Sequence, residues 1–442
     1  MKKVFIYGIG FVGYPLLLTL ANLKKSNFEV IGVEKNEQIV KKIQKQIHTG
    51  DCLIKTSDKK LSKLAKTNKS KNIKILPDNA NLSLRGIVLI AINFDNFKHV
   101  GKLKKTFKRI CNNLQNETTI IIESTLIPGT INKILLPILN ETIIKKKLDK
   151  NKIFFGFSYE RVMPGEKYLE SITDTHRNIS AINPASIKKI KSFYKKFINY
   201  KLKPFHIFKN ITECELAKII ENTYRALNIA YIDELNYFSL RAKLNLNSVL
   251  SSIRVRETHK NIMNPGIGVG GYCLTKDPSF LIQSSQKIFN FKNNFPLIKN
   301  LLKINNNMPE FSKKFILSKI TNPKKKKLLI VGYSYKNNVD DVRYSPTMDL
   351  YKRISKNFLN SEMIDPMIDK KKYELVVKKD IRKFQVVLLC VNHKNFKYKK
   401  LIENLNKNST LFDLCFYFKK KKINPVFKKE NIKIHQIGKY DE

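Results

Sequence analysis

Short apolar runs alternate with longer segments of helical character in the first part of the chain. Residues 3–7 (KVFIY) form a short, mainly apolar run, and similar runs follow at 29–36, 86–93 and 118–125. A mainly apolar run of this length is typical of a strand buried on both faces of a parallel sheet. Strands that alternate with helices therefore predict a doubly wound α/β domain over residues 1–200.

The middle of the chain has a different pattern, because residues 205–264 contain neither Gly nor Pro. The segment 212–246 predicts a long helix that is apolar on more than one side. One set of its apolar positions predicts a buried stripe, namely Leu216, Ile220, Leu227, Tyr231 and Leu235. Because a second apolar face remains, the helix is either central to the molecule or part of a dimer interface. We assign residues 201–310 to a helical dimerisation and catalytic region.

Strand-like runs return near the carboxyl end of the chain, at 326–333, 385–392 and 409–415. Helical segments lie between them, so residues 311–442 predict a second α/β domain. The expected fold is α/β, with two Rossmann-like doubly wound domains joined by a central helical region that contains a long helix.

Composition indicates a globular protein, with 42% hydrophobic and 10% aromatic residues. No apolar run reaches the length of a membrane span, and three glycines interrupt the apolar start in a way that a signal peptide would not. The six cysteines form no C-x-x-C pair and no zinc-like cluster. We expect reduced thiols, a cytoplasmic location and no metal site.

The formal net charge of +48 raises the alternative of a nucleic-acid-binding protein. The lysines, however, are spread along the whole chain and fall mostly where loops or element ends are expected. We favour a solvated basic surface that attracts anionic ligands over a nucleic-acid footprint.

A glycine pattern of the form G-x-G-x-x-G follows the first strand and opens a helix. Its residues are Gly8, Ile9, Gly10, Phe11, Val12 and Gly13. Such a loop brings the backbone and a helix N-terminus close to a pyrophosphate. Glu34 ends the second strand, where an acid accepts the ribose hydroxyls and repels a 2′-phosphate. The segment predicts a dinucleotide site that prefers NAD over NADP, and a glycine turn without a ligand is the alternative.

Residues 264–278 (NPGIGVGGYCLTKDP) hold four of the sixteen glycines. Cys273 lies just after the last of these glycines, and Lys276 and Asp277 follow it closely. Backbone amides and a nearby Lys stabilise a thiolate. A thiolate can add to an aldehyde, and the adduct can be oxidised to a thioester. A loop cysteine without a catalytic role is the alternative.

Polar side chains elsewhere add candidates for this chemistry. On the long helix, Lys218, Asn222 and Arg225 share a face and could stabilise an oxyanion, although spacing alone favours a solvated face. Glu160, in the turn YERVMPG (159–165), could act as a base or be an ordinary loop acid.

Six motifs then occur in a particular order: GIGFVG, ESTLIPGT, YERVMPG, AKIIENTYRALNIAYIDE, GVGGYCLTKDP and GYSYKNNVDDVRYSP. This succession resembles the UDP-glucose/GDP-mannose dehydrogenase family of nucleotide-sugar dehydrogenases, from residue 3 to about 366. The resemblance implies four-electron oxidation of the C6 alcohol of a UDP-sugar to a carboxylate, with NAD as cofactor. It also implies a homodimer whose last domain binds UDP.

The resemblance assigns catalytic roles by position. Cys273 matches the family nucleophile, and Asp277 matches the acid that orients or activates water. Lys218 and Asn222 match the pair that stabilises the C6 oxyanion. Glu160 matches the carboxylate implicated in thioester hydrolysis. Thr125, in the S-T motif, matches a residue near the cofactor that holds the catalytic water.

The resemblance also assigns binding roles. Tyr335 and Lys336 match an aromatic–Lys pair near the UDP-sugar, and Arg343 matches an arginine close to NAD. From the same motifs we expect Gly270 and Arg161 to border the substrate and Lys276 to border the cofactor.

Several positions depart from the family pattern and bear on the sugar. Tyr272 stands where many relatives have His, and Tyr335 where Phe is usual. Arg254 and Arg256 lie near the place from which several relatives supply an arginine across the dimer. YERVMPG resembles the UDP-N-acetylhexosamine branch, which favours UDP-N-acetylmannosamine or UDP-N-acetylglucosamine, whereas CLTKD resembles the UDP-glucose branch. UDP-glucose therefore remains an alternative, as does a two-electron NAD dehydrogenase of the hydroxyacid type.

Overall fold

The computed structural model describes residues 2–23, 28–54, 56–67, 72–394, 398–420 and 431–439. It divides into two compact units, each treated separately below. Unit 1 is Met1–Glu221 with Ser279–Asn294, and unit 2 is Asn222–Pro278 with Phe295–Glu442. Among the described residues, no helix is both long enough and apolar enough to cross a membrane.

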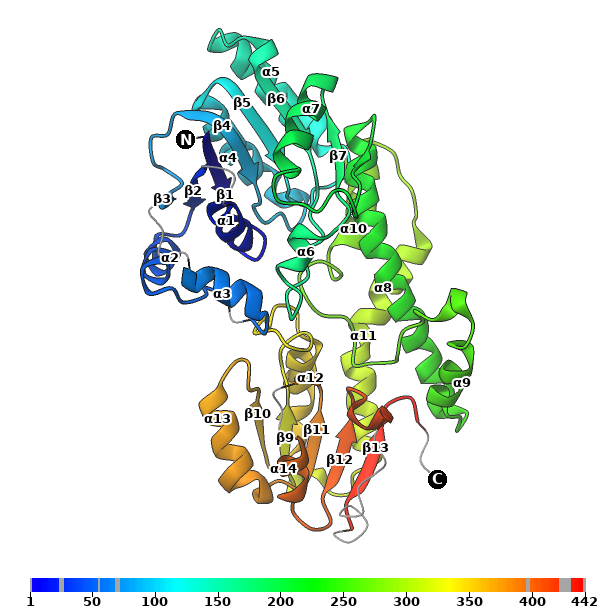
Figure 1. The fold of residues 1–442 in the computed structure, drawn as a ribbon. Helices are drawn as coiled ribbons and strands as arrows, with labels where there is room; N and C mark the ends of the chain where they lie inside the picture. Colours follow the sequence, from blue (N-terminus) through cyan, green and yellow to red (C-terminus); the bar gives the residue numbers. More distant parts are fainter. Residues whose placement is uncertain are drawn as a thin grey trace. The chain divides into compact units, whose positions relative to one another are not determined.

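Unit 1 is built on an eight-stranded sheet in the order β3-β2-β1-β4-β5-β6-β7-β8 (Figure 1). Its strands are β1 (Lys2–Tyr7), β2 (Phe28–Glu34), β3 (Ile73–Pro77), β4 (Leu84–Ile90), β5 (Leu114–Ile122), β6 (Ile153–Phe157), β7 (Asn178–Ala181) and β8 (His206–Ile207). Pairing is parallel from β3 to β6, and β7 runs antiparallel to β6. The order 3-2-1-4-5-6 is that of a doubly wound dinucleotide-binding sheet.

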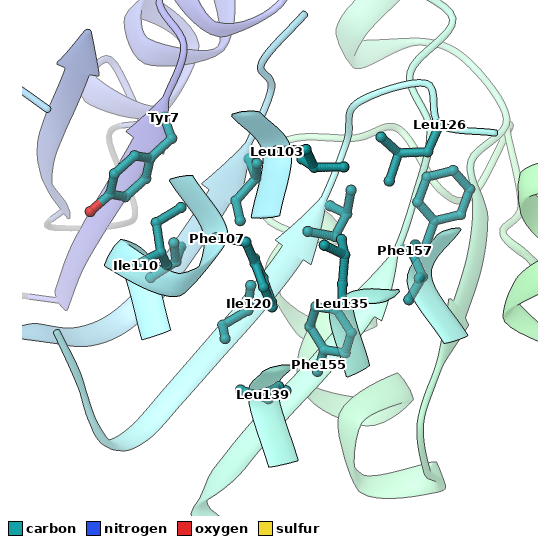
Figure 2. Close-up of a cluster of buried hydrophobic side chains, with 14 of the residues drawn as sticks. Tyr7, Leu103, Phe107, Ile110, Ile120, Leu126, Leu135, Leu139, Phe155 and Phe157 are labelled. Atoms are coloured by element: carbon teal, nitrogen blue, oxygen red, sulfur yellow. The ribbon is translucent and has the colours of Figure 1, made fainter. Parts of the chain in front are cut away.

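Helices cover both faces of this sheet, which explains why its strands are mainly apolar. The helices are α1 (Gly13–Ala21), α2 (Glu37–Thr49), α3 (Lys59–Thr67), α4 (Val100–Asn112), α5 (Leu136–Lys145), α6 (Glu170–Thr173), α7 (Pro184–Tyr194) and α10 (Asp277–Lys287). One core lies under α4 and α5, where Phe107 packs on Phe155 with ring centroids 5.9 Å apart (Figure 2). The other core lies under α1 and α7.

The helix α8 (Ile211–Arg241) begins in unit 1 and ends in unit 2. The stripe predicted to be buried on it is wrong, because Ile220 and Tyr231 are 52% and 55% exposed. Other residues of α8 are buried instead, among them Ile219, Ile232 and the small residue Ala226. The Ala226 carbonyl oxygen accepts a hydrogen bond from Asn305 of α11 at 3.5 Å.

Unit 2 contains a five-stranded parallel sheet in the order β10-β9-β11-β12-β13. Its strands are β9 (Lys327–Val331), β10 (Asn360–Ile364), β11 (Val386–Leu389), β12 (Thr410–Asp413) and β13 (Lys433–Gln436). The helices are α9 (Leu246–Ile253), α11 (Pro296–Ser318), α12 (Pro346–Ile354), α13 (Lys370–Leu375) and α14 (Tyr398–Glu403). In order of first appearance the sheet reads 2-1-3-4-5, a second doubly wound arrangement. The predicted fold class is confirmed.

Candidate active site

The glycine loop of unit 1 has the geometry that a bound pyrophosphate requires. A Cβ on Gly8, whose φ is +93°, would lie 2.6 Å from the Ala91 oxygen, and a Cβ on Gly13 would lie 2.0 Å from the Gly8 oxygen. Gly10 has no neighbour within 4 Å of such a Cβ. The outer glycines are thus needed for the turn and for helix packing, whereas the middle one leaves the backbone open to a ligand.

The other residues of this loop connect it to its surroundings. Phe11 and Val12 pack against the core under α1, and Val12 directly precedes that helix. The Glu34 carboxylate accepts hydrogen bonds from the Ile9 N–H at 3.1 Å and the Lys35 N–H at 2.9 Å. The acid predicted to contact the ribose therefore lies against the glycine loop.

The carboxyl ends of the parallel strands in unit 1 carry the remaining candidates of that unit. Thr125 is half-buried in the segment after β5, next to Ser124, whose hydroxyl donates to the Ile90 oxygen at 3.2 Å. Glu160 follows β6. In doubly wound sheets ligands bind outside this edge, so strand order alone gathers the glycine loop, Thr125 and Glu160 there.

Glu160 and Lys218 form a buried pair in unit 1. They are 8% and 6% exposed, and the Lys218 ammonium donates to the Glu160 carbonyl oxygen at 2.7 Å. The same ammonium lies 3.6 Å from the Glu160 carboxylate and 5.4 Å from the centre of the Tyr159 ring. Lys218 thus fixes both the backbone and the charge of the residue predicted to act on water.

Arg161 is bound within unit 1. Its guanidinium donates to the Glu221 carboxylate at 2.9 Å, to the His176 carbonyl oxygen at 2.6 Å and to the Tyr159 hydroxyl at 3.2 Å. The residue also lines an open hollow of about 450 Å³, together with Asp174, Thr175, His176, Asn178, Lys203, Pro204 and His206.

In unit 2, Cys273 lies just before α10 and is half-buried as a thiol. Its carbonyl oxygen accepts hydrogen bonds from the Lys276 and Asp277 N–H groups, at 3.2 and 3.0 Å. The fully buried Asp277 carboxylate is held from two sides, by the Asn222 amide at 2.6 Å and the Lys276 ammonium at 2.6 Å. The structure therefore joins Asn222, Lys276 and Asp277 in one cluster beside the cysteine.

The glycine-rich segment packs against the loop that follows β9. A Cβ on Gly270 would lie 3.0 Å from the Tyr335 Cβ, and the Gly271 N–H donates to the Arg343 carbonyl oxygen at 3.1 Å. The Arg343 guanidinium is held by Asp341 at 2.7 Å and lies 5.1 Å from the centre of the Tyr272 ring. Residues that are 65 to 72 positions apart in sequence thus meet in unit 2.

Positive charge surrounds Cys273 in this unit. Burial, followed by repulsion from Arg225, lowers the pKa of Lys336, and the charge of Cys273 acts in the opposite direction. Burial also raises the pKa of Tyr335 to about 12, with Asp341 and Cys273 adding to the effect and Arg343 opposing it. Cys273 is therefore electrostatically coupled to Lys336 and Arg343, an environment that favours a thiolate.

Sequence reasoning missed a buried charged cluster in unit 1 that consists of Glu123, Arg177 and Tyr194. Their exposures are 1%, 2% and 0%. Glu123 stood inside the quoted motif ESTLIPGT, but nothing in the sequence pairs it with an arginine 54 positions away. A lone charged residue in a mostly apolar stretch was the available signal.

Comparison with known proteins matches three consecutive segments of the chain. Models of the UDP-glucose/GDP-mannose dehydrogenase family match residues 2–198 (NAD binding domain), 212–307 (central domain) and 329–420 (UDP binding domain). The chain belongs to this family. The predictions of family membership, of an NAD-dependent nucleotide-sugar dehydrogenase and of NAD as cofactor are confirmed.

Individual relatives of this family cover the whole chain. A UDP-N-acetyl-D-mannosamine dehydrogenase from Methanococcus maripaludis is 30% identical over 99% of this chain and 95% of its own length. Two solved structures share the fold. The UDP-N-acetylmannosamine dehydrogenase of Staphylococcus aureus has a TM-score of 0.80 at 24% identity, covering 99% of this chain and 98% of its own. The UDP-N-acetylmannosamine dehydrogenase of Pyrococcus horikoshii has a TM-score of 0.79 at 21% identity, with full coverage of both chains.

Proposed function

We propose that this protein oxidises the C6 alcohol of a UDP-N-acetylhexosamine, in the first place UDP-N-acetylmannosamine, to the uronate through a thioester on Cys273. The observation that carries the proposal is the cluster at the start of α10, where Asn222 and Lys276 clamp the buried Asp277 carboxylate beside a half-buried thiol. A two-electron dehydrogenase would need no such cysteine.

The glycine loop fits NAD, because its open backbone at Gly10 and the N-terminus of α1 suit a pyrophosphate. Glu34, held at the Ile9 N–H, is placed to accept the ribose hydroxyls. NAD bound at this loop would supply the hydride acceptor for each of the two oxidations, with one molecule used per oxidation. We propose that Lys276 and Arg343 also contact this cofactor.

The covalent steps belong to Cys273. Once the alcohol has become an aldehyde, the thiolate adds to C6 and the carbonyl oxygen takes up a proton, which gives a thiohemiacetal. Its oxidation, with loss of the hydroxyl proton, gives a thioester. The N-terminus of α10 and the cations Lys336 and Arg343 favour the thiolate both as attacking and as leaving group.

Hydrolysis of the thioester needs a deprotonated water. We propose that the Glu160 carboxylate takes one proton as the water oxygen bonds to C6, the C6–S bond breaks and the Cys273 thiolate leaves. Lys218 and Asn222 stabilise the C6 oxyanion, and Thr125 and Asp277 orient water. The balance is one alcohol, one water and two NAD⁺ giving one carboxylate, two NADH and three protons.

The same proposal divides the chain into an NAD-binding domain (1–200), a helical region (201–310) and a UDP-sugar-binding domain (311–442). Gly270, Tyr335 and Lys336 contact the UDP-sugar. The packing of Gly270 on Tyr335 supports this assignment, since a larger residue at 270 would displace the loop after β9.

The acetamido sugar is supported by the name of the relatives and by Arg161. We propose that the loop 159–165 borders the sugar and that Arg161 in this loop donates hydrogen bonds to the acetamido carbonyl or to a phosphate. The Phe that the glucose branch has in this loop cannot donate such bonds. The contact with Glu221 orients the guanidinium. CLTKD around Cys273 favours UDP-glucose as the second candidate.

A homodimer is supported by the exposed face of α8. Ile220, Tyr224, Tyr231 and Phe238 are each 52–60% exposed and recur at intervals of four and seven residues. These intervals place them on one side of the helix, and an apolar stripe of this kind suits a second copy of the chain. We further propose a cytoplasmic location, where the six thiols stay reduced.

A panel of UDP-sugars with NAD tests the sugar assignment. We expect kcat/KM for UDP-N-acetylmannosamine or UDP-N-acetylglucosamine to exceed that for UDP-glucose by about 100-fold, since a site built to hydrogen-bond a group rejects sugars that lack it. Faster oxidation of UDP-glucose than of either acetamido sugar would contradict the assignment and leave the mechanism intact.

A further inference from the structure

The cluster of Glu123, Arg177 and Tyr194 lies directly behind the loop that carries Glu160. Glu123 follows β5, Arg177 precedes β7 and Tyr194 ends α7, so three elements of unit 1 each contribute one side chain. All three are nearly inaccessible to solvent. A buried ion pair is weak evidence for stability, because desolvation offsets much of the Coulomb attraction. Its location therefore suggests another role.

The Arg177 guanidinium binds in two directions. One nitrogen donates to the carbonyl oxygens of Tyr159 at 3.0 Å and Ser158 at 3.4 Å, the two residues before Glu160. The other nitrogen lies 3.4 Å from both oxygens of Glu123. Arg177 thus connects a buried carboxylate to the backbone of the Glu160 loop.

Glu123 and the two backbone carbonyl oxygens compete for the Arg177 guanidinium, and Tyr194 determines the outcome. Its hydroxyl donates to Glu123 at 2.6 Å, a much shorter contact than either from Arg177, and its ring lies 4.7 Å below the Arg177 guanidinium. Because Tyr194 supplies the short bond to Glu123, the arginine can remain on the backbone carbonyls. Without the hydroxyl, Glu123 would draw Arg177 away from Ser158 and Tyr159.

Charge is balanced across the same region of unit 1. Two positive charges, on Arg177 and Lys218, are paired with two negative charges, on Glu123 and Glu160. Lys218 of α8 also donates a hydrogen bond to the Glu160 carbonyl oxygen. The Glu160 loop is therefore held from both sides, by Lys218 and by Arg177.

We propose that Glu123, Arg177 and Tyr194 are positioning residues that hold the Glu160 carboxylate in place to accept a proton from the water that attacks the thioester. This inference rests on the proposed function, because it assigns the cluster to the hydrolytic half of that reaction. The hydrogen bonds of Arg177 run from Glu123 to the two residues before Glu160. The cluster should therefore affect uronate release and not the two oxidation steps.

Tyr194→Phe is the principal test, since it removes one hydroxyl and keeps the ring under Arg177. With limiting UDP-N-acetylmannosamine and rapid quenching, two rates are measured, NADH formation and uronate release. We expect uronate release to fall about 10- to 100-fold while NADH formation in a single turnover stays near wild type. Intact mass spectrometry should show more acyl-enzyme on Cys273. Arg177→Lys, which cannot bridge both carbonyls and Glu123, should act in the same direction.

Ser186→Ala is the matched control. Ser186 lies on α7 like Tyr194 and accepts a buried hydrogen bond from the Phe155 N–H of β6 at 3.3 Å. The substitution therefore removes a buried hydrogen bond between α7 and β6 and leaves the side chains of the cluster in place. Equal slowing of both rates in Tyr194→Phe, or the same behaviour in Ser186→Ala, would overturn the proposal.

A double-mutant cycle separates positioning from general loosening. If Tyr194 acts through Glu160, then Tyr194→Phe should have little further effect on uronate release in a Glu160→Gln background. Additive effects would overturn the inference. If wild-type enzyme forms no acyl-enzyme and only one NADH per sugar, then the proposed function itself fails. This outcome is distinct from the variant results that would overturn the positioning role alone.

Discussion

In the proposed mechanism, the chemistry depends on Cys273. It lies beside a carboxylate that is itself clamped by an amide and an ammonium, and cations of the loop after β9 couple to its charge. A serine there keeps the size but not the acidity, because an alkoxide forms far less readily than a thiolate.

We therefore expect Cys273→Ser to lower net turnover by roughly 1,000-fold or more while NAD affinity stays nearly unchanged, since the glycine loop is untouched. Steady-state uronate formation and NAD titration by fluorescence provide the two measurements. Turnover near that of wild type would exclude the thiol as nucleophile.

At the same scale, we propose that Glu34 determines the choice of cofactor. Its carboxylate faces the glycine loop, where a 2′-phosphate would meet a like charge. We expect kcat/KM for NAD to exceed that for NADP by about tenfold or more, and Glu34→Gln to narrow this ratio. Comparable values for both cofactors in the wild-type enzyme would contradict this placement.

At the scale of elements, a buried acid connects the first part of α8 to the rest of unit 1. The Glu215 carboxylate accepts hydrogen bonds from the Gly129 and Ile131 N–H groups, at 2.7 and 3.1 Å. Burial raises the pKa of Glu215 to about 8, and the two backbone bonds limit the rise. The folded protein therefore holds this proton more tightly than the unfolded chain does.

This linkage gives the sign of a pH dependence. The stabilisation is complete below the ordinary Glu pKa near 4.5 and is lost as pH rises through about 8. The free energy of unfolding of wild type relative to Glu215→Gln should fall between pH 5 and 8.5, by up to about 1.4 kcal/mol per pH unit. Urea unfolding across this range measures it, with the exposed Glu213→Gln on the same helix as control. A constant difference across the range would show that the pKa of Glu215 is not raised.

Elements also show how far the sequence could be interpreted. The glycine loop was predictable because all its determinants lie within six consecutive residues and the strand and helix around them. The buried side of α8 was not, because its buried residues, such as Ala226 and Ile232, follow no local pattern that indicates what packs there. Likewise β10 and β13 escaped prediction, since their sequences NSEMI and KIHQ mix polar and apolar residues.

The site was predictable in part for a related reason. Cys273 and Asp277 are four residues apart, so a motif contains both. The cluster behind Glu160 unites Glu123, Arg177 and Tyr194 from three elements, and only the folded sheet brings them together.

At the scale of the whole molecule, the exposed stripe on α8 predicts the oligomeric state. We expect wild-type protein to sediment as a dimer and Tyr231→Glu to shift it toward monomer, because a buried unpaired charge at an interface is costly. Leu359→Glu replaces another exposed apolar residue that is not on α8, and it should stay dimeric. A dimer that persists in Tyr231→Glu would place the interface elsewhere.

The central claim is that one active site performs both oxidations of the C6 carbon. The most direct measurement is the number of NADH molecules formed per UDP-sugar consumed, with the product identified by mass spectrometry. The mechanism predicts two NADH per sugar and a uronate as the product. One NADH per sugar with an aldehyde or ketone as the product would contradict it.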